Sequence, residues 1–155
     1  MFYPLLKEYL NDTALIPLVK YMSQDKMDRF AVVAEGVGAI HVDPRFAEKT
    51  PFHSTIAHGF LFVAYISEMM ENNFGVSWLE NGTIDMKNVG PAKPGDALLI
   101  TGTIKKHEPE GESQRLTCEV VVENQNAQKV AVGETTVLRA RKLKKNKNGE
   151  GLFDE

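Results

Sequence analysis

Residues 57–72 read AHGFLFVAYISEMMEN, and this stretch decides how the rest of the chain must be arranged. Its apolar side chains would lie on nearly every side of a helix, as far as Glu68. A helix that is apolar on all sides is normally buried on all sides. In a chain of 155 residues we therefore expect other elements to wrap around this helix.

Shorter helices are indicated before it. Ser23 is a suitable N-cap for a helix over residues 24–35, where apolar residues recur at helical spacing. The segment GVGAI, residues 36–40, then ends that helix, because two glycines in three residues disfavour its continuation. Asp43 followed by Pro44 predicts the start of a second short helix, since Asp caps well and Pro fits the first helical position.

The second half of the chain favours strands separated by turn-forming residues. We expect four strands, over Thr83–Val89, Ala97–Lys106, Leu116–Glu123 and Lys129–Leu138, with turns at 91–96, 109–113 and 124–127. Helices followed by antiparallel strands indicate the α+β class. The simplest packing is a curved antiparallel sheet folded around the long central helix.

Composition bounds the class of protein. The chain is 43% hydrophobic and 25% charged, which is typical of a globular domain. We expect one domain over residues 1–140 and a basic, flexible tail over 141–155. The net charge is −3, but residues 1–138 hold 12 basic and 18 acidic residues, and this acidic balance argues against nucleic-acid binding by the body of the chain. The tail is interpreted as solvated, with a contact to nucleotide phosphates as the alternative.

Several kinds of site and location are excluded or disfavoured. No stretch approaches the ~20 apolar residues of a membrane span. The first residues, MFYPLLKEYLND, lack the features of a secretory signal, so a cytoplasmic location is expected and no membrane association. Cys118 is the single cysteine, which excludes an intrachain disulfide and suggests a small core residue.

The chemistry is expected between residues 40 and 67. His41 follows the glycine-rich break, and an imidazole exchanges protons near neutral pH; the alternative is a histidine that packs and hydrogen-bonds locally. Gly59 begins the apolar helix, where unpaired N–H groups can stabilise a developing oxyanion; the alternative is a glycine that saves space. His58 is interpreted as a packing residue. Ser67 could share a face with Gly59 and orient His41, or could bond a backbone carbonyl.

The run IHVDPRFAEKTPFHSTIAHGFL, residues 40–61, resembles the signature of the MaoC-like dehydratases, which include (R)-specific enoyl-CoA hydratases. Residues 89–96 and 129–137 resemble that family's turn and last strand. The resemblance implies the hot-dog fold, a long helix wrapped by an antiparallel sheet, in a homodimer or a higher homo-oligomer. It also implies an acyl-CoA or acyl-ACP thioester as substrate in fatty acid metabolism, with no cofactor and no metal.

By the same resemblance, His41 matches the catalytic histidine and Gly59 the glycine whose N–H helps to form the oxyanion hole. Ser67 matches a supporting polar position, and Asp43 a non-catalytic aspartate. The family's catalytic aspartate, however, falls on Gly36. Glu35 is one residue earlier, and its longer side chain could reach the same space.

The leading hypothesis is therefore a hydratase or dehydratase of acyl thioesters, with His41, Gly59, Ser67 and Glu35 as candidate site residues. Two alternatives stay open. A chain without the aspartate could be a non-catalytic subunit that binds acyl-CoA or assists an active partner, and hot-dog folds also include thioesterases. Four phenylalanines near the motif could form the core or an acyl pocket: Phe46, Phe52, Phe60 and Phe62.

Overall fold

A computed structural model describes residues 13–140, together with 143–145 and 151–153. The helices are α2 (Gln24–Val33), α3 (Ala39–Val42), α4 (Pro44–Ala47), α5 (Gly59–Phe74) and α6 (Val76–Asn81). The strands are β1 (Leu18–Tyr21), β2 (Thr83–Asn88), β3 (Ala97–Glu110), β4 (Ser113–Asn124), β5 (Lys129–Ala140), β6 (Leu143–Lys145) and β7 (Gly151–Phe153). The α+β class is confirmed.

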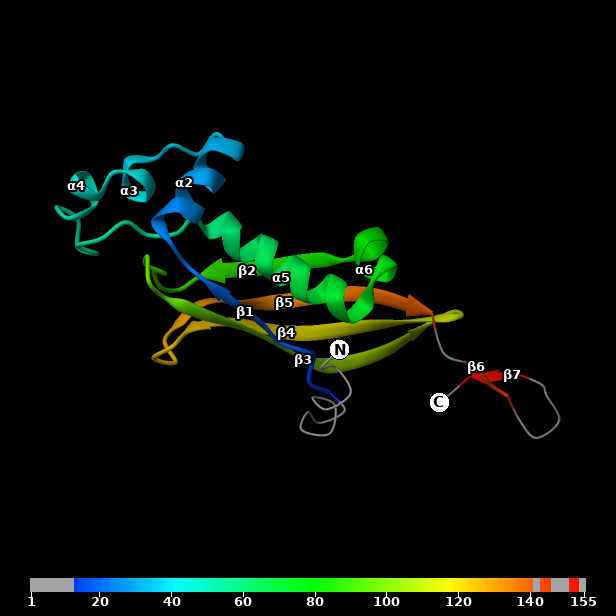
Figure 1. The fold of residues 1–155 in the computed structure, drawn as a ribbon. Coiled ribbons are helices and arrows are strands. Elements are labelled where there is room, and N and C mark those ends of the chain that lie inside the picture. Colours follow the sequence, from blue (N-terminus) through cyan, green and yellow to red (C-terminus); the bar gives the residue numbers. More distant parts are fainter. Residues whose placement is uncertain (1–12, 141–142, 146–150, 154–155) are drawn as a thin grey trace.

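Five strands form one antiparallel sheet in the order β1-β3-β4-β5-β2. Helix α5 lies along one face of this sheet, and α2, α3 and α4 gather beyond its N-terminal end (Figure 1). Strands β6 and β7 form a separate two-stranded sheet and have no other partner strand in the described part of the chain. The rest of the predicted tail, residues 141–142, 146–150 and 154–155, lies outside the described residues.

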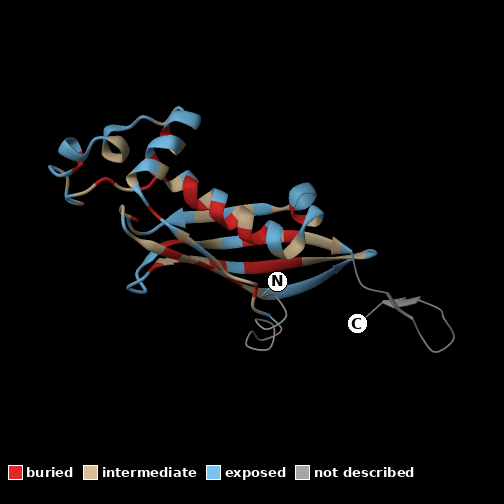
Figure 2. Ribbon diagram, viewed as in Figure 1, coloured by how far each residue is buried: buried red, intermediate tan, exposed pale blue. Residues whose placement is uncertain are grey.

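Helix α5 supplies most of the helical contribution to the core. Its fully or nearly fully buried residues face the sheet, where Figure 2 shows burial concentrated: Leu61, Phe62, Tyr65, Ile66, Met69 and Met70. The expectation of burial on every side was wrong for this single chain. Phe60 is 78% exposed, and Ala64 is exposed one turn later, because the sheet covers only one side of the helix.

Both predicted N-caps are confirmed. The side chain of Ser23 accepts a hydrogen bond from the backbone N–H of Lys26. The carboxylate of Asp43 accepts bonds from the N–H groups of Arg45 and Phe46, with Pro44 at the first helical position. These caps fix the two short helices before and after His41.

The turn predicted at 109–113 is narrower than expected. Pro109 belongs to β3 and is paired with Gln114, and the chain reverses at Gly111, whose φ is +61°. Strand β1 pairs with the first four residues of β3, and residues 13–15 bond to this edge as far as Ile104. Beyond Ile104, this edge of β3 has no partner strand among the described residues. A proline is tolerated at such an edge, because no neighbouring strand requires its missing N–H.

No helix in the described part of the chain is both long and apolar enough to cross a membrane.

Cys118 lies in β4 and is fully buried in the core, as expected. Burial disfavours the charged thiolate and raises the pKa of Cys118 to about 11, from an ordinary value of 9.0. Between about pH 9 and pH 11, the folded protein therefore keeps the thiol proton that the unfolded chain loses. The stability associated with the neutral thiol is complete below about pH 9 and is lost as the pH rises through about 11.

We predict that a thiol reagent such as 5,5′-dithiobis(2-nitrobenzoate) modifies Cys118 slowly in the native protein at pH 8 and rapidly in denaturant. The reason is that the thiol is both inaccessible and protonated in the folded state. Release of the coloured thiolate measures the rate. Equal rates with and without denaturant would contradict the buried position of Cys118.

Candidate active site

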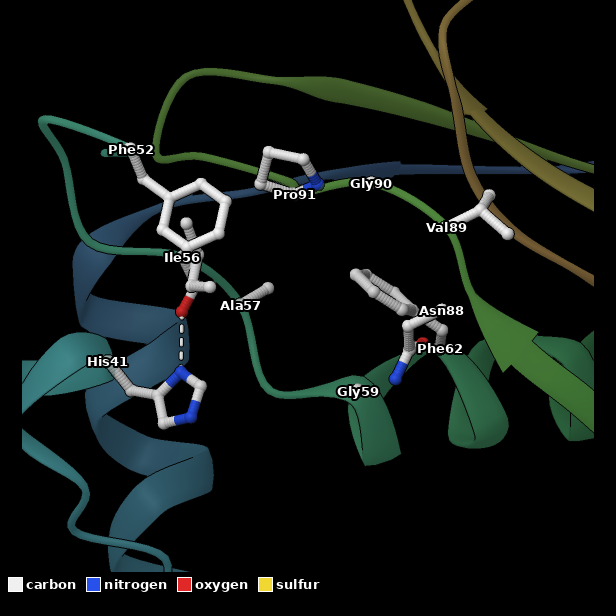
Figure 3. A pocket seen from close by; sticks show the side chains of 10 residues that line it. All are labelled: His41, Phe52, Ile56, Ala57, Gly59, Phe62, Asn88, Val89, Gly90 and Pro91. Carbon is white, nitrogen blue, oxygen red and sulfur yellow. Dashed lines mark hydrogen bonds between the residues drawn. The ribbon is translucent and has the colours of Figure 1, made fainter. Parts of the chain in front are cut away.

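His41 lies on α3 and faces a cavity. Its ring nitrogen Nδ1 is 2.8 Å from the carbonyl oxygen of Ile56. A carbonyl oxygen only accepts hydrogen bonds, so Nδ1 carries the proton, and in the neutral ring Nε2 carries the free lone pair. Figure 3 shows Nε2 pointing away from Ile56. The chain thus holds a proton-accepting nitrogen at a defined angle.

Gln24, at the start of α2, ties together both ends of the loop that carries His41. Its Nε2 donates to the backbone carbonyl of His41 at 2.9 Å, and its Oε1 accepts from the hydroxyl of Thr55 at 2.5 Å. The backbone N–H of Ile56 also donates to the carbonyl of Ile40. Gln24 was not predicted from the sequence, because nothing in its neighbourhood distinguishes it from an exposed residue in the first helical turn.

Gly59, the first residue of α5, lies across the cavity from His41 (Figure 3). Its backbone N–H has no acceptor among the described residues, as is usual in the first turn of a helix. The preceding N-cap residue, His58, makes no side-chain capping bond. The helix dipole places partial positive charge at this end. An unpaired donor in such a field favours an oxygen that acquires negative charge.

Asn88, the last residue of β2, is a polar residue of the cavity that the sequence analysis also missed. A Cβ built on Gly59 would lie 2.1 Å from Nδ2 of Asn88, so the amide occupies the space that glycine leaves open. The side chain has no hydrogen-bond partner among the described residues. Asn88 directly precedes the Val89–Asp96 turn, and its place beside this turn was the one feature of the sequence that could have indicated a role in the site.

The cavity has a volume of about 420 Å³, within the usual range of roughly 300–1,000 Å³ for small-molecule sites. Its lining is mainly apolar, with His41, Gly59 and Asn88 as polar or donor groups, and is completed by Phe52, Ile56, Ala57, Phe62, Val89, Gly90 and Pro91. Of the four phenylalanines singled out, Phe52 and Phe62 line this cavity. Phe46 is largely exposed, and Phe60 lines a different hollow.

His58 stacks on His41, with ring centroids 3.7 Å apart and planes inclined by 26°. It is buried, and its Nε2 donates to the carbonyl of Gly36 at 2.6 Å. Its Nδ1 is buried without a hydrogen-bond partner. His58 is therefore a packing residue at the start of α5, as interpreted from the sequence, and it also supports one face of the His41 ring.

Gly36 lies beside this pair of histidines. A Cβ at position 36 would be 3.3 Å from Nε2 of His58, which is close but needs a shift of only a few tenths of an ångström. The φ angle of Gly36 is not positive, so its backbone conformation is compatible with a side chain. Position 36 therefore has limited room for a side chain, and the glycine leaves this room unused.

The structure does not bring Glu35 or Ser67 to His41. Glu35 is exposed just beyond the end of α2, and no hydrogen bond or ion pair joins it to His41 among the described residues. Ser67 lines a second hollow, whose lining also includes Gly36 and His58, and its hydroxyl oxygen accepts a bond from Trp78 Nε1 at 2.9 Å. Eight residues at about 100° each leave an offset of about 80° around the helix, which turns Ser67 away from the Gly59 face.

Metal ligands do not gather in the described residues: no group of three or more His, Cys, Asp or Glu side chains there could hold a metal ion.

Comparison with known proteins identifies the family. The sequence model of the MaoC-like domain matches residues 11–127, which is most of the chain. The chain belongs to the MaoC-like domain family. An (R)-specific enoyl-CoA hydratase from Rhodospirillum rubrum is 29% identical over 124 residues, which cover 78% of this chain and 82% of the relative.

Solved structures of other proteins show the same fold. The R-hydratase PhaJ1 from Pseudomonas aeruginosa superposes with a TM-score of 0.71 at 21% identity, covering 94% of this chain and 87% of that one. A monoamine oxidase regulatory protein from Archaeoglobus fulgidus gives a TM-score of 0.74 at 21% identity, covering 87% and 94%. The expected hot-dog fold is therefore confirmed for this member of the MaoC-like family.

Proposed function

We propose that this MaoC-like protein is a hydratase of enoyl thioesters carried on CoA or acyl-carrier protein, or catalyses the reverse dehydration. The observation that carries the proposal is the shared cavity: a histidine with a free Nε2 and a helix N-terminus with an unpaired N–H line the same hollow. Family membership and the hydratase relative support the substrate class.

The chemistry follows from what each group can do. Nε2 of His41 takes a proton from water, while the water oxygen bonds to C3 of the enoyl group. The electrons of the C2–C3 double bond move toward the thioester carbonyl, whose oxygen becomes negative beside the Gly59 N–H. The protonated His41 then gives its proton to C2, the carbonyl is restored, and the net change is the addition of one water molecule.

In this scheme, His41 is the single acid–base group, and no carboxyl group shares the proton transfers with it. Gly36 provides no carboxylate, Glu35 lies in solvent, and Ser67 is engaged with Trp78. Of the four candidate residues, we retain His41 and Gly59 as the catalytic pair. Because general acid–base assistance is worth about 10²–10⁴ in rate, we expect a slow hydratase.

The second candidate is a subunit that binds acyl thioesters without turning them over. The absence of a carboxylate at Gly36 favours it, since such a chain would depend on an active partner. Calorimetric titration with acyl-CoA beside a hydration assay separates the two: binding without hydration supports the assisting subunit. Release of free thiol from acyl-CoA would instead identify a thioesterase.

We predict that His41→Ala lowers kcat/KM for crotonyl-CoA and longer enoyl-CoAs by at least about 10²-fold, because the proton acceptor is lost. Loss of the enoyl absorbance measures the rate. His107→Ala is the matched control, since His107 is exposed on the distal part of β3 and is expected to leave the rate unchanged. A wild-type protein inactive on every chain length would reject the hydratase proposal.

We also predict that Gly36→Asp raises kcat for enoyl-CoA hydration by tenfold or more, since it adds a carboxyl group beside the histidine pair. Gly36→Asn is the control, because it has nearly the same shape and cannot exchange a proton in the same way. Equal rates for the two variants would show that position 36 offers space alone and no catalytic contribution.

We infer that a second copy of the chain covers the surface that the sheet leaves open. Phe60 is 78% exposed on α5, and β2 is an edge strand with no partner on its outer side among the described residues. Exposed apolar surface and a free strand edge are both features of association sites. A homodimer in the cytoplasm is the simplest arrangement.

For the homodimer we predict that sedimentation velocity gives about twice the mass of the 17.3 kDa chain. Phe60→Asp should shift the protein toward the monomer, because a charge would replace the exposed apolar ring. Val76→Asp is the control at another exposed apolar position, on α6. A wild-type protein that sediments as a monomer at micromolar concentration would contradict the inference.

A further inference from the structure

The amide of Asn88 has no part in the mechanism above, although it lies in the same cavity. It ends the edge strand β2, where its backbone pairs with Ala131, and the chain then turns through Val89 and Gly90. Both of these turn residues direct their N–H groups to the carbonyl of Val130, at 2.9 and 3.2 Å. The position of Asn88 is thus fixed by the sheet rather than by a loose loop.

The side-chain amide lies directly beside Gly59. Nδ2 is 2.1 Å, and Cγ 3.0 Å, from the point where a Cβ of residue 59 would be. The backbone nitrogen of Gly59 is bonded to the same Cα that would carry this Cβ, so the two nitrogen donors are neighbours. Neither donor has an acceptor among the described residues. Figure 3 shows the Asn88 side chain and the start of α5 at Gly59 across the cavity from the imidazole of His41.

Resting on the proposed hydratase function, we propose that Asn88 is a further catalytic residue, whose Nδ2 donates the second hydrogen bond to the thioester oxygen beside the Gly59 N–H. A carbonyl oxygen that becomes negative can accept two hydrogen bonds, and two donors placed in advance stabilise it more than one. The amide is neutral, so it donates without changing the charge of the cavity.

With Asn88 in this role, a side chain at residue 59 would displace the second donor. Any Cβ there would overlap the Asn88 amide and push it away from the Gly59 N–H. Glycine therefore serves two purposes at this position: it exposes its own N–H, and it leaves the space that the second donor occupies.

The test compares Asn88→Leu, which keeps a similar volume and removes the donor, with Asn88→Asp, which places a negative charge where negative charge develops. Lys87→Ala is the control, since Lys87 is the neighbouring residue on β2 and does not line the cavity. Loss of one oxyanion donor lowers kcat by about 10²–10³-fold in other enzymes. We expect a fall of about 100-fold for Asn88→Leu, a larger fall for Asn88→Asp, and a change in KM below about threefold.

A second readout does not require turnover. Cinnamoyl-CoA absorbs at longer wavelength when its thioester carbonyl is polarised by hydrogen bonds, so binding to the wild type should shift its absorbance to the red. Asn88→Leu should bind the probe with a clearly smaller shift, and Lys87→Ala with the full shift. A reduced shift without any hydration by the wild type would support the donor role and reject the hydratase proposal.

Hydration that proceeds equally in Asn88→Leu and the wild type, with equal red shifts, would overturn the inference and leave the hydratase proposal intact. Failure of the wild type to bind cinnamoyl-CoA would reject both. A higher KM for Asn88→Leu with an unchanged kcat would also overturn the inference. It would assign Asn88 to substrate binding and not to stabilisation of the transition state.

Discussion

An apolar helix has to be covered, and α5 shows how this constraint arranges the whole domain. Six of its residues are buried against the sheet, so the axis of the helix is held along the sheet face. Its N-terminus consequently emerges where the loop after α4 and the turn after β2 meet. The backbone N–H of Ala57 donates to the carbonyl of Ala92 at 2.8 Å and joins those two segments. The cavity is formed at that junction.

Within this frame, a small number of hydrogen bonds sets the chemistry. The carbonyl of Ile56 decides which nitrogen of His41 carries the proton, and Gln24 holds the loop that supplies the carbonyl. The stacked ring of His58 limits the freedom of His41 on one side. The site therefore has a well-defined proton acceptor with the unpaired Gly59 N–H across the cavity, and position 36, where the resemblance implies a carboxylate, is a glycine. The arrangement favours oxyanion stabilisation over shared acid–base catalysis.

Local signals were sufficient to predict much of this fold from the sequence. The caps at Ser23 and Asp43 and the long apolar helix each depend on neighbouring residues, and the four long strands were found because turn-forming residues separate them. Strand β1 was missed because it has only four residues, and α6 because its six residues lie between Gly75 and Gly82. Such short elements exist through their tertiary contacts and carry little local signal.

The site was predictable only in part for the same reason. The resemblance placed His41 and Gly59 near each other, and both line one cavity. Helical spacing and the resemblance both suggested Ser67, but the remaining rotation of the helix turns it to another hollow. Gln24 and Asn88 come from distant elements, and only the packed structure brings them to the loop and to Gly59.

The central claim is that the imidazole of residue 41 and the amide N–H of residue 59 act on one thioester. The most direct test is a crystal structure with a bound saturated acyl-CoA, which has no double bond to hydrate. The account predicts the thioester oxygen within hydrogen-bond distance of the Gly59 nitrogen, with Nε2 of His41 facing C2 and C3 of the acyl chain. A thioester bound away from this cavity, or a His41 ring turned so that Nε2 contacts Ile56, would contradict it.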